Sequence, residues 1–153
     1  MPIILPVLLA PLGWRRRLPF PRLGVRGVVV APGGSVLLVR HTYVAGWYLP
    51  GGGVERGESA EASLARELME EANVEVVERP QLHGLFFNSK ASPRDHVACY
   101  VVRKFRQVAP HVGNLEIAEA GFFAPDALPA DTTQATRRRI AEVLSGAAVD
   151  EMW

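Results

Sequence analysis

The segment GGGVERGESAEASLARELMEEANV, residues 51–74, joins a glycine-rich turn to a helix-forming stretch that carries closely spaced carboxylates. Glu67, Glu70 and Glu71 are spaced i, i+3, i+4, which places all three side chains on one face of an α-helix. Like charges this close repel each other, so helix stability alone does not explain the pattern. A divalent cation would relieve the repulsion, because carboxylate oxygens suit Mg²⁺ and Mn²⁺. The pattern therefore predicts a metal site on this helix.

The ends and the buried face of this helix follow from local signals. Ser59 is a favourable N-cap and Glu61 lies in the first turn, so we expect the helix to run from Ala60 to Ala72. The face opposite the carboxylates is apolar and is expected to be buried; it comprises Leu64, Ala65, Leu68, Met69 and Ala72.

The fixed positions of the segment match a known motif. Gly52 is followed after five residues by Glu58 and after seven more by the run RELMEE at 66–71, and Val74 closes the segment. This pattern resembles the Nudix box. One position differs, since Asn73 stands where the family has a glycine that ends the helix. Asparagine tolerates the left-handed conformation that such a helix end needs, so the helix end is expected to be preserved.

The resemblance covers about residues 24–145 and implies the family fold, an α/β/α sandwich with a mixed central sheet. We expect residues 24–148 to form a single α/β Nudix domain, preceded by an apolar and basic segment at residues 1–23. Runs of β-branched and apolar residues predict strands at 25–30, 36–40, 74–77, 81–87 and 96–103, the first two as a hairpin. A final helix is predicted over 132–144.

The predicted final helix has its own start and stop signals. Asp131 is the expected N-cap and Gly146 the expected end. The run Arg137–Arg139 is expected to lie largely on the solvated face of this helix.

The resemblance also implies a reaction, the hydrolysis of a pyrophosphate bond in a nucleoside diphosphate linked to another group, with Mg²⁺ or Mn²⁺. The implied metal ligands are the Gly51 carbonyl, Glu67, Glu70, Glu71 and Glu116, with Glu119 as the alternative to Glu116. The implied catalytic set is Glu70, Glu67, Arg66 and Glu58. Either Glu70 or Glu67 is expected to be the general base, whereas Glu58 and Arg66 are expected to hold the loop against the helix.

Candidate substrate contacts are cationic side chains in unusual places. Arg26 and Arg40 stand in otherwise apolar strands, and Lys90 lies in a polar loop, so each is a candidate phosphate contact or, alternatively, an ordinary surface cation. Residues 41–55 resemble small bacterial Nudix proteins similar to ADP-ribose pyrophosphatases, which favours an ADP-ribose-like substrate, with nucleoside triphosphates next. A non-catalytic nucleotide-sensing Nudix domain is the alternative, although such domains tend to lose box glutamates and this chain keeps them all.

Composition limits the compartment and the partners. The chain has 153 residues and a net charge of +1, so it is long enough for one domain and too close to neutral to indicate nucleic-acid binding. A single cysteine, Cys99, cannot form an internal disulfide, and a cytoplasmic protein is expected. The expected partner is a small nucleotide substrate.

The first dozen residues are strongly apolar. Basic residues 15–17 follow this stretch instead of preceding it, which is unlike a signal peptide. The stretch is also too short, and too interrupted by proline, to span a membrane. We expect it to pack on its own domain or on a second subunit of a homodimer; an interfacial membrane anchor is the alternative.

Overall fold

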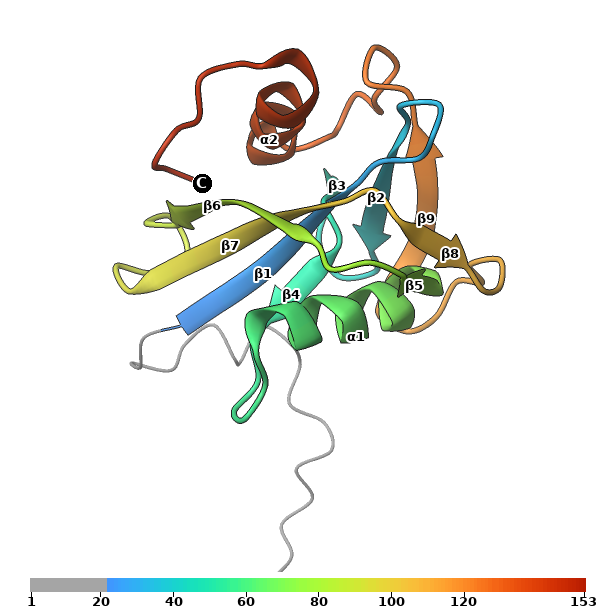
Figure 1. Cartoon of the computed structure of the whole chain (residues 1–153), viewed down its shortest axis with the longest axis horizontal. Helices are drawn as coiled ribbons and strands as arrows, with labels where there is room; N and C mark the ends of the chain where they lie inside the picture. Colours follow the sequence, from blue (N-terminus) through green and yellow to red (C-terminus); the bar gives the residue numbers. More distant parts are fainter. Residues whose placement is uncertain (1–21) are drawn as a thin grey trace, which may run out of the picture.

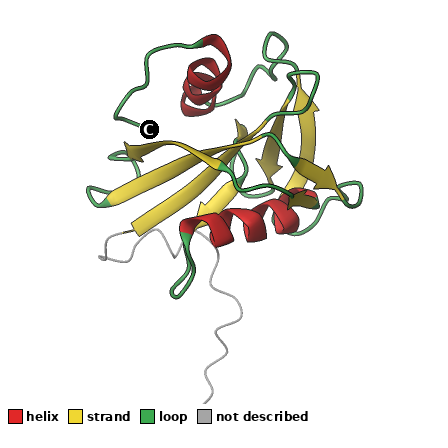
Figure 2. Ribbon diagram, viewed as in Figure 1, coloured by secondary structure: helices red, strands yellow, loops and turns green. Residues whose placement is uncertain are grey.

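The computed structural model describes residues 22–153 and contains two helices on opposite sides of a layer of strands (Figures 1 and 2). The predicted apolar and basic segment comprises residues 1–23, of which residues 1–21 lie outside the described residues. The elements in chain order are β1 (Arg22–Val29), β2 (Val36–His41), β3 (Trp47–Tyr48), β4 (Gly51–Gly53), α1 (Ala60–Ala72), β5 (Val74–Val76), β6 (Gln81–Phe87), β7 (Asp95–Val102), β8 (Phe105–Gln107), β9 (Ile117–Phe123) and α2 (Gln134–Ser145).

The largest sheet has the strand order β4-β1-β7-β6. It is mixed, because β1 runs parallel to β7 but antiparallel to β4. A second sheet has the order β3-β2-β9, and β5 pairs with β8. The predicted fold, an α/β/α sandwich with a mixed central sheet, is therefore confirmed.

The predicted hairpin of the first two long strands is wrong. Val30 and Val36 form a single antiparallel bridge at the turn, after which the chains separate. β1 enters the first sheet and β2 enters the second. The turn residues favour a hairpin locally, but β1 pairs with β4 and β7, and β2 pairs with β3 and β9. The short strands β3, β4 and β8 were not predicted, because two or three residues are too few to show a period.

Helix α1 has the predicted bounds and ends. The Ser59 side chain accepts a hydrogen bond from the Ala62 N–H, and Asn73 adopts the left-handed conformation with φ 54°. Leu64, Leu68 and Ala72 are buried in the core on one face of the main sheet, as predicted. Ala65 and Met69 are exposed instead, whereas Ser63 and Glu71 are buried. The buried stripe is thus rotated toward β4, which brings a carboxylate into the interior.

Helix α2 covers the opposite face of the sheet. Its N-cap is Thr133, whose side chain accepts a hydrogen bond from the Thr136 N–H, and not the predicted Asp131. The Asp131 carbonyl accepts instead from the Trp47 N–H at 3.2 Å, which ties the approach to α2 to β3. The predicted end at Gly146 is confirmed by its φ of 68°.

The prediction that Arg137–Arg139 lies largely on a solvated face is wrong for Arg139, which is completely buried. Its guanidinium group pairs with Glu142 and lies 3.9 Å from the centre of the Phe86 ring. Residues that follow α2 close this core. The Phe87 N–H donates to the Glu151 carbonyl at 2.8 Å, and the Trp153 N–H donates to the Phe87 carbonyl at 3.0 Å.

In residues 22–153, no helix combines the length and the apolar composition needed to cross a membrane.

Candidate active site

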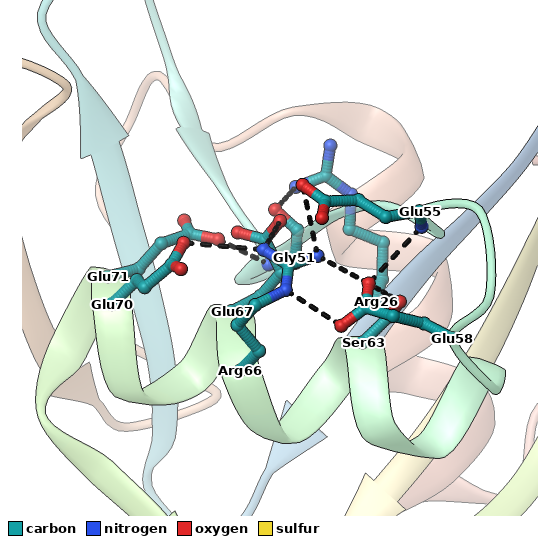
Figure 3. A network of polar contacts seen from close by, with 9 residues as sticks. All are labelled: Arg26, Gly51, Glu55, Glu58, Ser63, Arg66, Glu67, Glu70 and Glu71. Carbon is teal, nitrogen blue, oxygen red and sulfur yellow. Dashed lines mark hydrogen bonds and ion pairs between the residues drawn. The ribbon is translucent and has the colours of Figure 1, made fainter.

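The loop before α1 is fixed by a two-pronged contact between Glu58 and Arg66 (Figure 3). Arg66 Nε donates to Glu58 Oε2 and Arg66 Nη2 donates to Glu58 Oε1, both at 2.9 Å. Glu58 Oε1 also accepts from the Ser63 hydroxyl at 2.7 Å and the Glu55 N–H at 3.2 Å. The Arg66 and Ser63 contacts lower the pKa of Glu58 from its ordinary 4.5 to about 2, because they stabilise the carboxylate.

Arg66 also reaches the other carboxylates of its helix face. Its Nη1 donates to Glu67 Oε1 at 3.1 Å and to Glu70 Oε2 at 3.4 Å. The surrounding carboxylates, with Glu58 first, raise the pKa of Arg66. The Glu67 side chain is only 12% exposed, whereas the Glu70 side chain is 56% exposed. The Arg66 guanidinium group therefore orients both Glu67, which is mostly buried, and Glu70, which faces solvent.

Glu71 is the interior member of the carboxylate face. It is 2% exposed, and its Oε1 accepts a 2.9 Å hydrogen bond from the Gly51 N–H. Its Oε2 is buried and has no hydrogen-bond partner among residues 22–153. Burial raises the pKa of Glu71 well above its ordinary value; the Arg26 charge opposes that rise, and the negative charge of Glu67 adds to it.

Two glycines let the β4 strand approach these carboxylates. A Cβ on Gly51, where φ is +145°, would lie 2.0 Å from the Val25 carbonyl oxygen. A Cβ on Gly52 would lie 2.4 Å from Glu67 Oε1. Only glycine fits either position without a shift of its neighbours, so the glycine-rich turn brings backbone atoms directly against the helix.

The three candidate substrate contacts lie in different places. Arg26 is directed at residues 49–51, the turn that leads into β4 and is called the β4 turn below. Its Nη1 donates to the Leu49 and Gly51 carbonyls at 3.1 and 3.2 Å. Arg40 pairs with Glu119 across β2 and β9, and its guanidinium carbon lies 6.0 Å from the centre of the Trp47 ring. Lys90 is exposed in the turn between β6 and β7, and β6 is the opposite edge of the sheet from β4.

The two candidate carboxylates near β9, Glu116 and Glu119, differ in their surroundings. Glu119 lies in β9 and forms the ion pair with Arg40. Glu116 directly precedes β9 and is half-buried, and its N–H donates a 2.9 Å hydrogen bond to Asn114 Oδ1. Its carbonyl accepts a hydrogen bond from the Thr42 N–H at 2.9 Å. The choice of Glu116 as a metal ligand stays a prediction.

The residues of the helix face fit a hard divalent cation. Their donors are all oxygens, and the buried Glu71 Oε2 is the kind of unsatisfied acceptor that a cation would satisfy. Within residues 22–153, no three His, Cys, Asp or Glu side chains already converge as a metal site. Their carboxylates are instead paired with Arg66 and the Gly51 N–H (Figure 3).

Comparison with known proteins gives the class of the chain. The NUDIX domain family matches residues 20–144, and the chain therefore belongs to this family. Over 71 residues, 46% of this chain and 46% of the relative, it is 38% identical to a MutT-like protein of Streptomyces ambofaciens. Over 73 residues, 40% of this chain and 49% of the relative, it is 38% identical to a Bacillus subtilis (strain 168) protein named "Putative 8-oxo-dGTP diphosphatase".

The chain spans about half the length of these two curated relatives. A longer match is to the crystal structure of a MutT NUDIX hydrolase from Burkholderia pseudomallei. That match has a TM-score of 0.69 and 28% identity, and it covers 81% of this chain and 98% of the other. The predicted family is therefore confirmed.

Sequence reasoning missed two contacts of this site. Ser63 was not singled out, although its hydroxyl holds Glu58; a serine four residues after the Ser59 N-cap was the available signal. The contact of Arg26 with the β4 turn was also missed, because nothing local in the sequence joins residues 26 and 51.

Proposed function

We propose that this chain is a divalent-metal-dependent pyrophosphohydrolase that cleaves the diphosphate of a nucleotide derivative by attack of water. The observation that carries the proposal is the buried Glu71 carboxylate. It is fixed on the Gly51 N–H and keeps one oxygen without a hydrogen-bond partner among residues 22–153. A buried anion of this kind is costly to fold unless a cation compensates it.

The proposed ligands are the Gly51 carbonyl, Glu67, Glu70, Glu71 and Glu116. A bound Mg²⁺ or Mn²⁺ would supply charge neutralisation for the diphosphate and a lowered pKa for the attacking water. Glu70 or Glu67 would accept the proton of that water as general base. Glu70 is the more accessible to solvent, with 56% of its side chain exposed against 12% for Glu67.

The roles proposed for Arg66 and Glu58 are to position these carboxylates. Arg66 contacts Glu67 and Glu70 directly, while Glu58 holds the other edge of its guanidinium group. Such supporting contacts keep reactive groups within the small positional tolerance that catalysis needs. Arg40 and Lys90 remain proposed contacts to substrate phosphates.

Two substrate classes are proposed. The first is a nucleoside diphosphate linked to another group, such as ADP-ribose, which the resemblance of residues 41–55 favours. The second is a nucleoside triphosphate, which the name of the Bacillus subtilis relative favours. The two classes give different products. ADP-ribose hydrolysis releases AMP and ribose 5-phosphate, whereas cleavage of a triphosphate between its α- and β-phosphates releases a nucleoside monophosphate and pyrophosphate.

The test is a substrate panel with ADP-ribose, related nucleoside diphosphate derivatives, 8-oxo-dGTP and ordinary nucleoside triphosphates, each with Mg²⁺, with Mn²⁺ and with excess chelator. We expect metal-dependent release of a nucleoside monophosphate from at least one compound. Glu70→Gln should lower turnover by roughly 100-fold or more, because a catalytic carboxylate is lost. Glu61→Gln is the matched control, since Glu61 lies on the same helix but pairs with Arg79.

Activity that survives the chelator, or a Glu70→Gln variant as active as Glu61→Gln, would contradict the proposal. Binding of nucleotides without any hydrolysis would favour the sensing alternative. The homodimer and the cytoplasmic location stay predictions.

A further inference from the structure

Three successive carbonyl groups of the β4 turn, those of Leu49, Pro50 and Gly51, accept hydrogen bonds from β1. Arg26 Nη1 donates to the carbonyls of Leu49 and Gly51 at 3.1 and 3.2 Å, and the Gly27 N–H donates to the Pro50 carbonyl at 3.0 Å. Arg26 and Gly51 are also direct partners in the strand register. The side chain and the backbone of one short stretch of β1 therefore hold the whole turn.

The two peptide groups that flank the Cα of Gly51 are fixed from opposite sides. The Gly51 N–H donates to Glu71 Oε1, and the Gly51 carbonyl accepts from Arg26. Its φ is +145°, and a Cβ at this position would lie 2.0 Å from the Val25 carbonyl oxygen, so the Gly51 backbone packs closely against β1. A change at Arg26 should therefore reach Glu71 through the backbone of Gly51.

We infer that Arg26 is a positioning residue for the proposed metal site: it aims the Gly51 carbonyl and holds its N–H on Glu71. This inference rests on the proposed function and replaces the expectation of a phosphate contact for this residue. Arginine suits the task because its planar group can donate to two carbonyls at once, whereas lysine offers a compact point charge. A carbonyl oxygen has two lone pairs, so the Gly51 oxygen keeps one for a cation.

The test uses the full chain with Arg26→Gln, Arg26→Lys and the control Arg22→Gln. Arg22 lies four residues earlier in β1, so its replacement removes the same charge from the same strand. Two quantities are measured without substrate. One is the dissociation constant of Mn²⁺ by calorimetry, and the other is the hydrogen-exchange rate of the Gly51 amide by NMR.

Arg26→Gln should weaken Mn²⁺ binding about 10-fold or more, which is typical when the support of a metal ligand is lost. The Gly51 amide should exchange at least about 10-fold faster, because its hydrogen bond to Glu71 opens more often. Arg22→Gln should stay within about twofold of the wild type for both. Arg26→Lys should fall between, and it alone decides the test if Arg26→Gln does not fold.

Three outcomes would overturn the inference. KM is measured separately, with a substrate that the panel above identifies; a raised KM with unchanged Mn²⁺ affinity and amide exchange would make Arg26 a substrate contact. Tighter Mn²⁺ binding would mean that its guanidinium group obstructs the cation. Unchanged values for every quantity would leave it no role. A wild-type chain that binds no Mn²⁺ would contradict the proposed function itself, and the amide exchange would then still decide whether Arg26 holds the turn.

Discussion

The Glu67 carboxylate packs directly on the backbone of Gly52, so closely that a Cβ on Gly52 would lie 2.4 Å from Glu67 Oε1. The obstacle is the end of a flexible side chain and not backbone. Gly52→Ala should therefore move the carboxylate without disrupting the fold. The next glycine, Gly53, has open space at its Cβ position and provides a matched control.

We predict that Gly52→Ala lowers kcat by about 100-fold, since displacing a reacting group by 1 Å has an effect of that order. Its unfolding free energy should change by no more than about 1 kcal/mol. Gly53→Ala should keep both activity and stability near the wild-type values. Steady-state kinetics and urea unfolding test both variants, and equal activity in the two would refute the close packing as a functional constraint.

The contact of Glu58 with Arg66 predicts a specific loss of stability in acid. The pKa of Glu58 is lowered from 4.5 to about 2 in the folded chain, so the folded state holds the proton less tightly than the unfolded state. The stabilisation is fully present above pH 4.5 and is lost as the pH falls toward 2. Glu58→Gln should remove this part of the pH dependence.

The measurement is urea unfolding followed by tryptophan fluorescence between pH 6 and pH 3. The wild type should lose stability across this range more steeply than Glu58→Gln. Glu61→Gln provides the control, because Glu61 makes an ion pair with Arg79, which is 83% exposed. If Glu58→Gln and Glu61→Gln give the same slope, the lowered pKa of Glu58 has no measurable effect on folding.

Replacing the buried Glu71 by glutamine should preserve the stability of the fold without metal but remove the stabilisation by Mn²⁺. The amide oxygen can still accept from the Gly51 N–H, while the charge that burial disfavours is removed. Without metal, Glu71→Gln should therefore be as stable as the wild type at pH 7, or more stable. The wild type alone should gain stability from Mn²⁺, by about 2.7 kcal/mol at 100 times the dissociation constant.

Thermal unfolding with and without Mn²⁺ tests this prediction. Glu75→Gln is a suitable control, because Glu75 pairs with Arg106 on β5 and β8, away from the carboxylate face. A full Mn²⁺-dependent rise in the Tm of Glu71→Gln would show that Glu71 is not a ligand.

Helix α1 illustrates what the sequence could predict. Its bounds, its N-cap Ser59 and its left-handed end at Asn73 were all predicted correctly, because each signal lies within a few residues of the feature it determines. The carboxylate face followed from helical spacing alone. The rotation that buries Glu71 and exposes Met69 was not predictable, since it depends on β4 approaching from outside the helix.

The region around α2 illustrates the limit. The run Arg137–Arg139 predicts a solvent-exposed Arg139, yet this residue is completely buried. The residues that bury it lie on β6, far away in the sequence, and in the segment that follows α2. Its guanidinium group lies over Phe86 and Trp153, and its Nη1 donates to the Met152 carbonyl at 2.8 Å. A sequence pattern records the period of one helix but not which distant segment will cover it.

Glu142 compensates this buried charge and gives the largest predicted effect on stability. Its Oε2 accepts from Arg139 Nη2 at 2.9 Å and from the Asp150 N–H at 3.0 Å, and its Oε1 lies 2.9 Å from His83 Nε2. Glu142→Gln would leave the Arg139 cation without its counter-charge in the interior. Breaking a buried pair in this way costs about 3–5 kcal/mol, whereas an exposed pair contributes at most about 1 kcal/mol.

Urea unfolding should accordingly show a loss of about 3–5 kcal/mol for Glu142→Gln and of about 1 kcal/mol or less for Glu75→Gln, whose partner Arg106 is 69% exposed. The double variant Arg139→Met with Glu142→Leu removes both charges at once. It should be more stable than Glu142→Gln alone, because replacing a buried ion pair by apolar groups avoids the uncompensated charge. If Glu142→Gln loses no more stability than Glu75→Gln, the buried pair does not hold α2 and the residues after it against the sheet.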